Sequence, residues 1–349
     1  MLLYWIWFAE LKNISLLQKH RLLEQAGDPE TLYHSPADRW DIPQKVKTAL
    51  QDKNLTYAQK LLADCKSKGI GILPVSDIAY PCRLRNTQDA PLVLYYKGVL
   101  PDWDSVPFIG VVGTRKASVY GMQVARRLAS QITRSGGRII SGGAAGADTA
   151  AMLGGLEAGG SVVGVLGCGV DVVYPSSNKK LFAAVAENGC LLSEYPPGTA
   201  PLSWNFPARN RIISGISSGV LVVEAPDRSG ALITARYAME QGRDVYVVPG
   251  NIDNASCAGS NQLLQEGAAP VFSGWNVLEN YEFLYPGKLK KQRTAPLFTG
   301  EQSTSAVAQT VRKPESKSEK TETASSKLKS PRGSSIFPVG PMSSATNAS

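Results

Sequence analysis

The sequence is short of the side chains that metal sites and disulfide frameworks use. Its 349 residues include only two histidines, His20 and His34, and five scattered cysteines without a CxxC pair. Zinc sites and disulfide scaffolds need cysteines or histidines at ordered spacings, so we expect neither, and no cofactor is indicated. Unpaired, scattered cysteines are typical of a reducing cytoplasm, which is where we expect the protein.

Long apolar runs are also missing. The N-terminal stretch MLLYWIWF is apolar but short, has no basic residue before it, and leads into Glu10 and Lys12. A signal peptide has a longer apolar core and a small-residue cleavage site. A membrane-spanning helix needs about 18 consecutive apolar residues, and no run approaches that length. The sequence therefore predicts no membrane partner.

Positive charge is concentrated at one end of the chain. The formal net charge is +8, but residues 288–349 hold 11 of the 37 lysines and arginines and only 4 of the 29 acidic residues. Residues 1–287 are therefore almost neutral, and a basic binding site among them must be local. The Ser-, Thr-, Lys- and Pro-rich composition of 288–349 predicts a disordered tail. Its charge either attracts acidic partners loosely or is merely solvated.

Hydrophobic spacing predicts a helical first domain at residues 1–69. Leu16, Leu17, Leu22 and Leu23 recur at the three- and four-residue spacing of helices that pack around a core. The alternative is a SAM-like or helix-hairpin-helix module, which holds DNA phosphates with a glycine-rich turn. Here the expected turn, residues 12–15, has the sequence KNIS and no glycine.

Strand-like and helix-like segments alternate in the second predicted domain, residues 70–287. Residues 70–107 form a connector with short strands of its own. Strands are then expected at 108–112, 138–141, 162–166, 191–193, 220–224 and 245–248, with helices between them such as 120–135 and 147–158. This alternation predicts an α/β fold with a Rossmann-like, doubly wound, mostly parallel sheet. Ligands of such sheets bind at the carboxyl ends of the strands.

The first two of these strands lead into glycine-containing turns. Gly113, Thr114 and Arg115 follow the first, where backbone amides, a helix N-terminus and a guanidinium suit an anion. A surface ion pair is the competing interpretation of Arg115. The turn is not GxGxxG, and no acidic residue follows the second strand at the ribose position, which disfavours a dinucleotide.

The second strand ends in SGGAAGAD. Ser141, Gly142, Gly143 and Gly146 belong to a loop predicted to form an amide nest for an anion, beside the first turn. The alternative is a tight turn that needs positive φ angles. Asp148 is interpreted as the cap of the next helix.

Two further segments contribute candidate residues. Lys179 and Lys180 open a helix after the third strand and could reach a phosphate, although a solvated helix face is equally compatible. Tyr174 precedes them and could stack on a base, but a buried tyrosine before proline is the commoner case.

The segment 205–213, NFPARNRII, places two arginines directly before an apolar strand. We interpret it as a loop that leads into a helix, facing a chain of phosphates. Arg209 and Arg211 are two apart, so only one points inward if the segment is helical, and we expect this to be Arg211. Glu224, at the end of the next strand, is a possible partner for one of them.

No catalytic set accompanies these anion-binding features. Both histidines lie outside the predicted sheet, no serine sits in a nucleophile elbow, and no carboxylate cluster suggests a metal. Amide-rich turns with arginines and few acids predict a binding groove rather than an enzyme.

The order of the motifs resembles a known family. Between about residues 73 and 281 the chain contains GTRKASVYG, SGGAAGAD, VLGCGVDVVYP, LLSEYPPGT, FPARNRIISGIS, SGALITA and GSNQLLQEGA. This series resembles the DNA-processing protein A (DprA, also called Smf) family, for which PARNRI followed by SGALIT is highly specific. The helical N-terminal residues resemble the SAM-like or helix-hairpin-helix domain of that family more loosely.

The resemblance implies a cytoplasmic bacterial protein whose extended Rossmann-like domain binds single-stranded DNA largely without sequence preference. It also implies a homodimer that protects DNA taken up in natural transformation and helps to load the RecA recombinase. By position, Arg115 and the glycines of SGGAAGAD would cradle phosphates, and Asn210 and Arg211 would line the same groove.

The chain departs from the family pattern in ways that make this groove less basic. Ala145 stands where many members have a basic or aromatic residue, Met152 where they have histidine, and Ser176 where lysine is frequent. Lys179 or Lys180 would have to compensate. The C-terminal winged helix of many members is replaced by the Ser- and Lys-rich tail.

An enzyme is the alternative to a DNA-binding protein. Nucleotide-processing phosphoribohydrolases of the "lonely guy" type have related folds and a PGGxGTxxE loop with a catalytic glutamate. At the comparable place this chain has APDRSGALITA, which lacks that glutamate. A third possibility is a dimeric scaffold for RecA.

Overall fold

The computed structural model describes residues 1–292. Its first part is helical, as predicted, with the elements α1 (Leu2–Glu10), α2 (Leu16–Ala26), α3 (Pro29–His34), η1 (Ala37–Arg39), α4 (Gln44–Leu50) and α5 (Thr56–Ser67). A capping box starts α2: Ser15 Oγ accepts from the Gln18 amide, and Gln18 Oε1 accepts from the Ser15 amide. The KNIS segment is the turn before this helix, with Asn13 at a φ of 64°. Neither a separate domain at 1–69 nor DNA binding by this turn is tested, and both stay predictions.

Within the described residues, nine strands follow in a single mixed sheet: β1 (Gly71–Pro74), β2 (Val93–Gly98), β3 (Phe108–Val112), β4 (Arg138–Ser141), β5 (Val162–Val165), β6 (Cys190–Ser193), β7 (Gly219–Val222), β8 (Asp244–Val247) and β9 (Ala269–Pro270). The strand order is β1-β2-β6-β5-β4-β3-β7-β8-β9. The pairs β1–β2 and β2–β6 are antiparallel, and the others are parallel. The predicted α/β fold with a mostly parallel sheet is confirmed.

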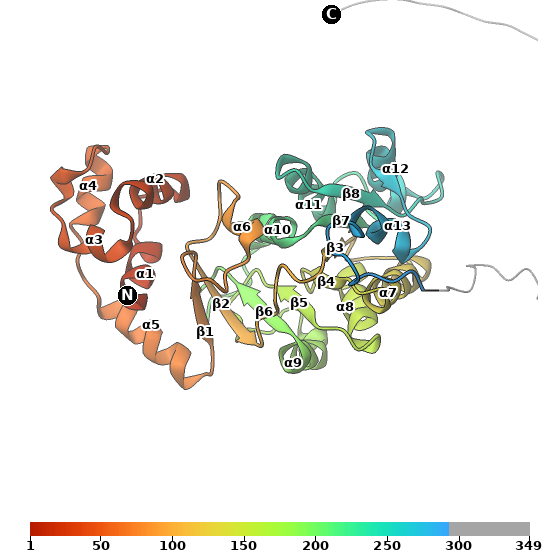
Figure 1. Cartoon of the computed structure of the whole chain (residues 1–349), viewed down its shortest axis with the longest axis horizontal. Coiled ribbons are helices and arrows are strands. Elements are labelled where there is room, and N and C mark those ends of the chain that lie inside the picture. The colour runs from red at the N-terminus through yellow and green to blue at the C-terminus, as the bar shows by residue number, and fades with distance from the viewer. Residues whose placement is uncertain (293–349) are drawn as a thin grey trace, which may run out of the picture. The chain divides into compact units, whose positions relative to one another are not determined.

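Helices cover both faces of this sheet, since successive strand residues point to opposite faces. Ile109 and Val111 of β3 pack in one apolar cluster, together with α7 (Val119–Arg134), α8 (Ala147–Glu157), α9 (Lys179–Asn188) and α13 (Gly274–Leu278). Val112 of β3 packs in the other, with α6 (Cys82–Arg85), α10 (Asn205–Ile216) and α11 (Gly230–Glu240). Figure 1 shows α10 and α11 across the sheet from α7 and α8.

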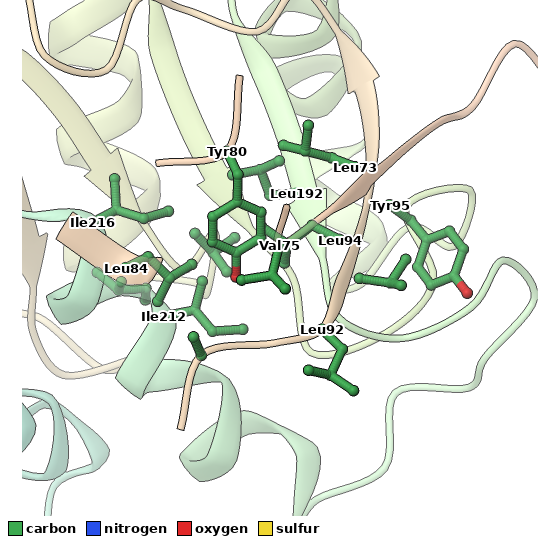
Figure 2. Packing of buried hydrophobic residues seen from close by; sticks show 14 of the residues in the cluster. Leu73, Val75, Tyr80, Leu84, Leu92, Leu94, Tyr95, Leu192, Ile212 and Ile216 are labelled. Carbon is green, nitrogen blue, oxygen red and sulfur yellow. The ribbon is translucent and has the colours of Figure 1, made fainter. Parts of the chain in front are cut away.

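The second cluster also anchors the connector at residues 70–107. Figure 2 shows Tyr80 and Leu84 of the connector packed against Ile212 and Ile216 of α10. Tyr80 is fully buried, and its hydroxyl donates to the carbonyl of Pro91 at 2.8 Å. The position of α10 is therefore determined by the connector as well as by the sheet.

The ends of two regions differ from the predictions. The strand predicted at 220–224 stops at Val222, and Glu224 turns away so that its carbonyl accepts from the amide of Thr114. After β8 the chain forms α12 (Ala258–Gln265), and α13 follows β9. The remaining 3-10 turns are η2 (Ser176–Asn178), η3 (Ala255–Cys257) and η4 (Glu279–Tyr281).

The described chain continues past the predicted domain end at Gly287. Leu289 is buried, and the amide of Lys290 donates to the carbonyl of Ser135 at 3.0 Å. Residues 288–292 are therefore part of the fold, and the rest of the predicted disordered tail lies outside the described residues. Within residues 1–292, no helix has both the length and the apolarity needed to cross a bilayer.

Candidate nucleic-acid interface

Three turns meet at the carboxyl ends of neighbouring parallel strands. The turns follow β4, β3 and β7, which are adjacent in the sheet. Together with the start of α10 they surround a pocket of about 330 Å³. The predicted site residues Gly113, Thr114, Arg115 and Asn210 line this pocket, while the other predicted ones do not.

The turn after β3 contributes exposed cations. Arg115 and Lys116 are exposed, while the amide of Thr114 donates to the carbonyl of Glu224 at 2.7 Å and so fixes the turn to β7. The guanidinium carbon of Arg115 lies 5.1 Å from the ring centre of Phe206, which also lines the pocket. A cation and an aromatic ring therefore share one wall of the pocket.

The loop after β4 approaches this turn closely. Gly146 has a φ of +82°, and a Cβ there would lie 2.5 Å from the carbonyl oxygen of Thr114. Only glycine combines this φ with that contact, so the loop and the turn require it. Ser141 is fully buried and donates to the carbonyl of Val111 at 2.7 Å. The carbonyl of Gly143 accepts a hydrogen bond from Asn178. Three predicted site residues of this loop thus have structural partners.

The anion held by this loop is a side chain of the protein itself. Asp148 is buried, and its carboxylate accepts a hydrogen bond from the backbone amide of Ala144 at 3.3 Å. The backbone amides of Gly113 and Gly142 also favour its charged form. Burial raises the pKa of Asp148 to about 6, and Arg209 and these amides oppose that rise. In the structure these amides face Asp148, and binding of an external anion by this loop stays a prediction. The residue at the cap position of α8 is Gly146 rather than Asp148.

Arg209 is the arginine that points inward. Its Nη1 donates to the carbonyls of Gly142, at 2.8 Å, and of Val165, and its side chain lines the pocket. Burial lowers its pKa to about 10, an effect that Asp148 opposes, so Arg209 is charged at neutral pH. Arg209 therefore joins α10 to the loop after β4 and to β5, and its charge favours the ionised form of Asp148.

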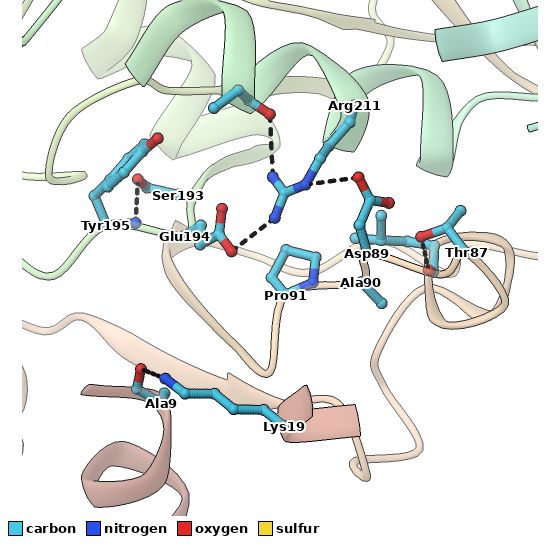
Figure 3. A network of polar contacts seen from close by, with 12 residues as sticks. Ala9, Lys19, Thr87, Asp89, Ala90, Pro91, Ser193, Glu194, Tyr195 and Arg211 are labelled. Atoms are coloured by element: carbon cyan, nitrogen blue, oxygen red, sulfur yellow. Dashed lines mark hydrogen bonds and ion pairs between the residues drawn. The ribbon is translucent and has the colours of Figure 1, made fainter. Parts of the chain in front are cut away.

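Arg211 points away from the pocket, contrary to the expectation that it would be the inward arginine. Its Nε lies 3.1 Å from Oδ2 of Asp89, and its Nη2 lies 2.7 Å from Oε1 of Glu194 (Figure 3). All of NFPARNRII belongs to α10, which begins at Asn205, so the segment itself contains no loop residues. Two residues along a helix turn a side chain by about 200°, so Arg209 and Arg211 face opposite sides. A DNA contact by Arg211 stays a prediction.

Glu224 does not pair with either arginine. It accepts a hydrogen bond from the amide of Ser118 at 2.8 Å and another from the hydroxyl of Ser118, the cap of α7. This carboxylate therefore stabilises the start of α7 and is not part of the pocket wall.

The turn after β7 supplies a third wall of the pocket, and its residue Arg228 was not predicted as a site residue. Arg228 is exposed and lines the pocket together with Ser229, whose Oγ accepts from the Ala231 amide at the start of α11. Phe206 was also not predicted as a site residue. The available signals were an aromatic residue next to PARNR and an arginine in the turn between a strand and the following helix.

Lys179 and Tyr174 lie outside the pocket lining. Lys179 is exposed as the first residue of α9, which confirms that it opens a helix. Tyr174 is 40% exposed rather than buried, and its ring centre lies 5.4 Å from that of Phe206. In the part of the chain that the structure describes, no three His, Cys, Asp or Glu side chains gather as a metal site.

Comparison with known proteins points to one family. The model of DNA recombination-mediator protein A matches residues 71–282. DNA processing protein DprA of Bacillus subtilis is 39% identical over 257 residues, covering 72% of this chain and 86% of that protein. The DprA of Streptococcus pneumoniae is 45% identical over 213 residues, covering 60% of this chain and 73% of that one.

Solved structures give the same result. The X-ray structure of DprA from Streptococcus pneumoniae matches with a TM-score of 0.71 and 35% identity over 80% of this chain and 98% of that chain. DprA from Helicobacter pylori, whose structure describes a single-stranded DNA binding mode, matches with a TM-score of 0.56 and 29% identity. That match covers 62% of this chain and 97% of that chain.

Proposed function

Because the chain belongs to the DNA recombination-mediator protein A family, we propose that it binds single-stranded DNA without sequence preference in this pocket. The relative from Helicobacter pylori, with its described single-stranded DNA binding mode, supports this ligand. The family relationship also supports a role in DNA processing and recombination.

One observation carries the proposal: three exposed cations surround an aromatic ring at a single pocket. Arg115, Lys116 and Arg228 supply positive charge for phosphates, and Phe206 offers a ring to a base. Aromatic stacking tolerates any base because every base has a π-face, and it requires the base to be unpaired. This combination favours a single strand over a duplex and gives no means of reading sequence.

The finer role that we propose follows from the family. The protein acts as a cytoplasmic homodimer that protects DNA entering in natural transformation and helps RecA to assemble on it. We propose that it does so by binding rather than by catalysis. Asp148 is the carboxylate of the described pocket lining, and it is buried and accepts a hydrogen bond from the amide of Ala144, which leaves it poorly placed to act as a general base.

The proposal is tested by fluorescence anisotropy with labelled oligo-dT and a duplex of the same length across a salt series. We expect tighter binding of oligo-dT and a log K that falls with log salt by about 0.7 for each phosphate neutralised. Equal binding of both DNAs, or binding of neither at low salt, would contradict the proposal.

A pair of arginine variants locates the site. Arg115→Ala removes an exposed cation from the pocket wall, so we expect oligo-dT affinity to fall by about 1 kcal/mol or more without a change in thermal stability. Arg236→Ala is the matched control, because Arg236 is an exposed arginine of α11 outside the pocket lining. Equal effects of the two substitutions would show that the pocket is not the binding site.

Recombinase loading and catalysis each need their own assay. RecA ATPase activity on oligonucleotides coated with a single-strand binding protein should rise when the protein is added. An unchanged rate would contradict the loading role. Release of free base from a nucleoside monophosphate would instead favour the enzyme.

A further inference from the structure

Tyr174 presents an aromatic ring directly beside the pocket. It lies in the loop between β5 and α9, is 40% exposed, and its ring centre is 5.4 Å from that of Phe206 at an interplanar angle of 42°. Phe206 in turn contacts Arg115 on the pocket wall. The aromatic surface of the pocket therefore continues outward along the chain to Tyr174.

The loop that carries Tyr174 is fixed at both ends. Asn178 is buried, and its Nδ2 donates to the carbonyl of Gly143 at 3.0 Å and to Oγ1 of Thr149 at 2.7 Å. On the other side, Asp171 accepts from the amide of Gly198 at 2.7 Å. A ring held in this way loses little conformational entropy when a ligand stacks on it.

The charges beside Tyr174 favour an anionic chain as the neighbour. Asp171 is the acidic group of this loop, and Lys68 pairs with it at 2.8 Å. Lys179 and Lys180 are both exposed in the first turn of α9, and this first turn contains no acidic residue. The N-terminus of a helix already carries partial positive charge and normally attracts acidic side chains. Two lysines there add to this positive charge, and a bound phosphate would reduce the repulsion between them and the helix N-terminus.

We propose that Tyr174 stacks on an unpaired nucleobase adjacent to the one in the pocket, and that Lys179 and Lys180 hold the phosphates that follow. This inference rests on the proposed binding of single-stranded DNA and extends that site by one nucleotide or more. It gives a physical role to a tyrosine whose ring is half exposed in water. It also gives the DNA strand a path, which runs from the pocket past Tyr174 to the start of α9.

The first test separates stacking from charge. Binding of the full-length wild type and of Tyr174→Ala is measured with oligo-dT and with a strand of equal length that is abasic at every position. Both strands carry the same phosphates, but only oligo-dT offers bases. We expect Tyr174→Ala to weaken oligo-dT binding about 10-fold, within the range of base–aromatic stacking, and to leave binding of the abasic strand unchanged.

Tyr174→Phe is the conservative variant, because it keeps the ring and removes the hydroxyl. It should bind oligo-dT like the wild type. Unchanged oligo-dT binding by Tyr174→Ala would overturn the inference. An equal loss on both strands would overturn it too, since that pattern reports a change in charge or fold.

A fluorescent reporter provides a second measurement. Trp204 is 68% exposed, so the reporter variant Tyr174→Trp is made together with Trp204→Phe to remove that background signal. Oligo-dT should quench the fluorescence of the new tryptophan, and the abasic strand should not. Absence of quenching at saturating oligo-dT would overturn the inference.

Failure of this inference is distinguishable from failure of the proposed function. If the wild type binds oligo-dT and Arg115→Ala weakens it, but Tyr174→Ala does not, only the stacking role of Tyr174 is overturned. If the wild type binds neither strand, both proposals are overturned.

Discussion

Asp148 places a buried carboxylate next to a pocket whose exposed cations are Arg115, Lys116 and Arg228. Its pKa is raised to about 6, chiefly by burial, so the carboxyl changes its charge close to neutral pH. An ionised Asp148 repels a phosphate, whereas a protonated one does not. The loop amides that hold the carboxylate are the ones the sequence suggested for a phosphate.

This arrangement predicts pH-dependent DNA binding. We expect oligo-dT affinity to rise as the pH falls from 7 to 5, because binding of an anion favours the protonated form of a group whose pKa is about 6. Asp148→Asn should bind more tightly at pH 7 and lose this dependence. Anisotropy titrations at several pH values provide the measurement. A wild-type-like pH profile in Asp148→Asn would assign the effect to another group.

The raised pKa of Asp148 also makes folding stability depend on pH, in the opposite sense to a carboxylate whose pKa is lowered in the folded state. The folded-state pKa of Asp148 exceeds its unfolded value, so the folded protein binds the proton more tightly. The resulting stabilisation is fully present below the unfolded pKa and is lost as the pH rises through about 6.

At the scale of elements, Arg211 connects α10 with two other segments of the fold. Burial alone would lower its pKa, but Glu194 and Asp89 outweigh that effect and raise it. Glu194 follows β6, and Asp89 lies in the connector. The ion pairs therefore fix α10, which carries Phe206 and Arg209, to the connector and to the segment after β6.

Arg211→Ala should therefore act on stability first. We expect a loss somewhat below the roughly 3–5 kcal/mol that breaking a fully buried ion pair costs, because both carboxylates keep partial solvent contact. Urea unfolding gives the free energy. Oligo-dT affinity, measured where the variant is folded, should change less than in Arg115→Ala. A larger loss of affinity than of stability would restore Arg211 as a direct DNA contact.

Arg209 and Arg211 show which features of the site could be predicted from the sequence and which could not. Alternating apolar runs predicted six of the nine strands to within two residues, since strand and helix periods are local properties. The turns GTR and SGGAAG were located because ligands bind at strand ends in this fold class. Which of two arginines points inward depends on the rotation of α10 about its axis, and α10 packs through Ile212 and Ile216 against the connector, which is distant in sequence. The contact of Asp148 with the loop amides likewise could not be predicted, because it depends on distances that only the folded structure gives.

At the scale of the whole molecule, one loop of the connector links the helical segment to the site helix. Asp89 pairs with Arg211, while the carbonyl of the next residue, Ala90, lies 2.7 Å from Nε2 of His20 in α2. Lys19, also in α2, is buried, which lowers its pKa to about 8 despite the opposing effect of Glu10. The contacts of Asp89 with Arg211 and of Ala90 with His20 join residues that are 122 and 70 positions apart in sequence, so neither had a local signal.

The charge beyond residue 292 provides the last prediction. Residues 293–349 contain eight lysines and arginines and four glutamates, whereas every residue that lines the pocket lies between Val112 and Thr234. A chain that ends at Gln292 should therefore keep its preference for oligo-dT over duplex. Its log K should fall less steeply with log salt, by about 0.7 for each phosphate contact that the missing lysines and arginines would have made.

Anisotropy titrations of both chains across a salt series check this expectation. The two affinities should differ at low salt and converge at high salt, because general charge attraction is screened whereas stacking and close contacts persist. If the shorter chain lost oligo-dT binding at every salt concentration, the main binding site would lie beyond Gln292. If the two salt slopes were identical, the positive charge of residues 293–349 would have no part in DNA binding.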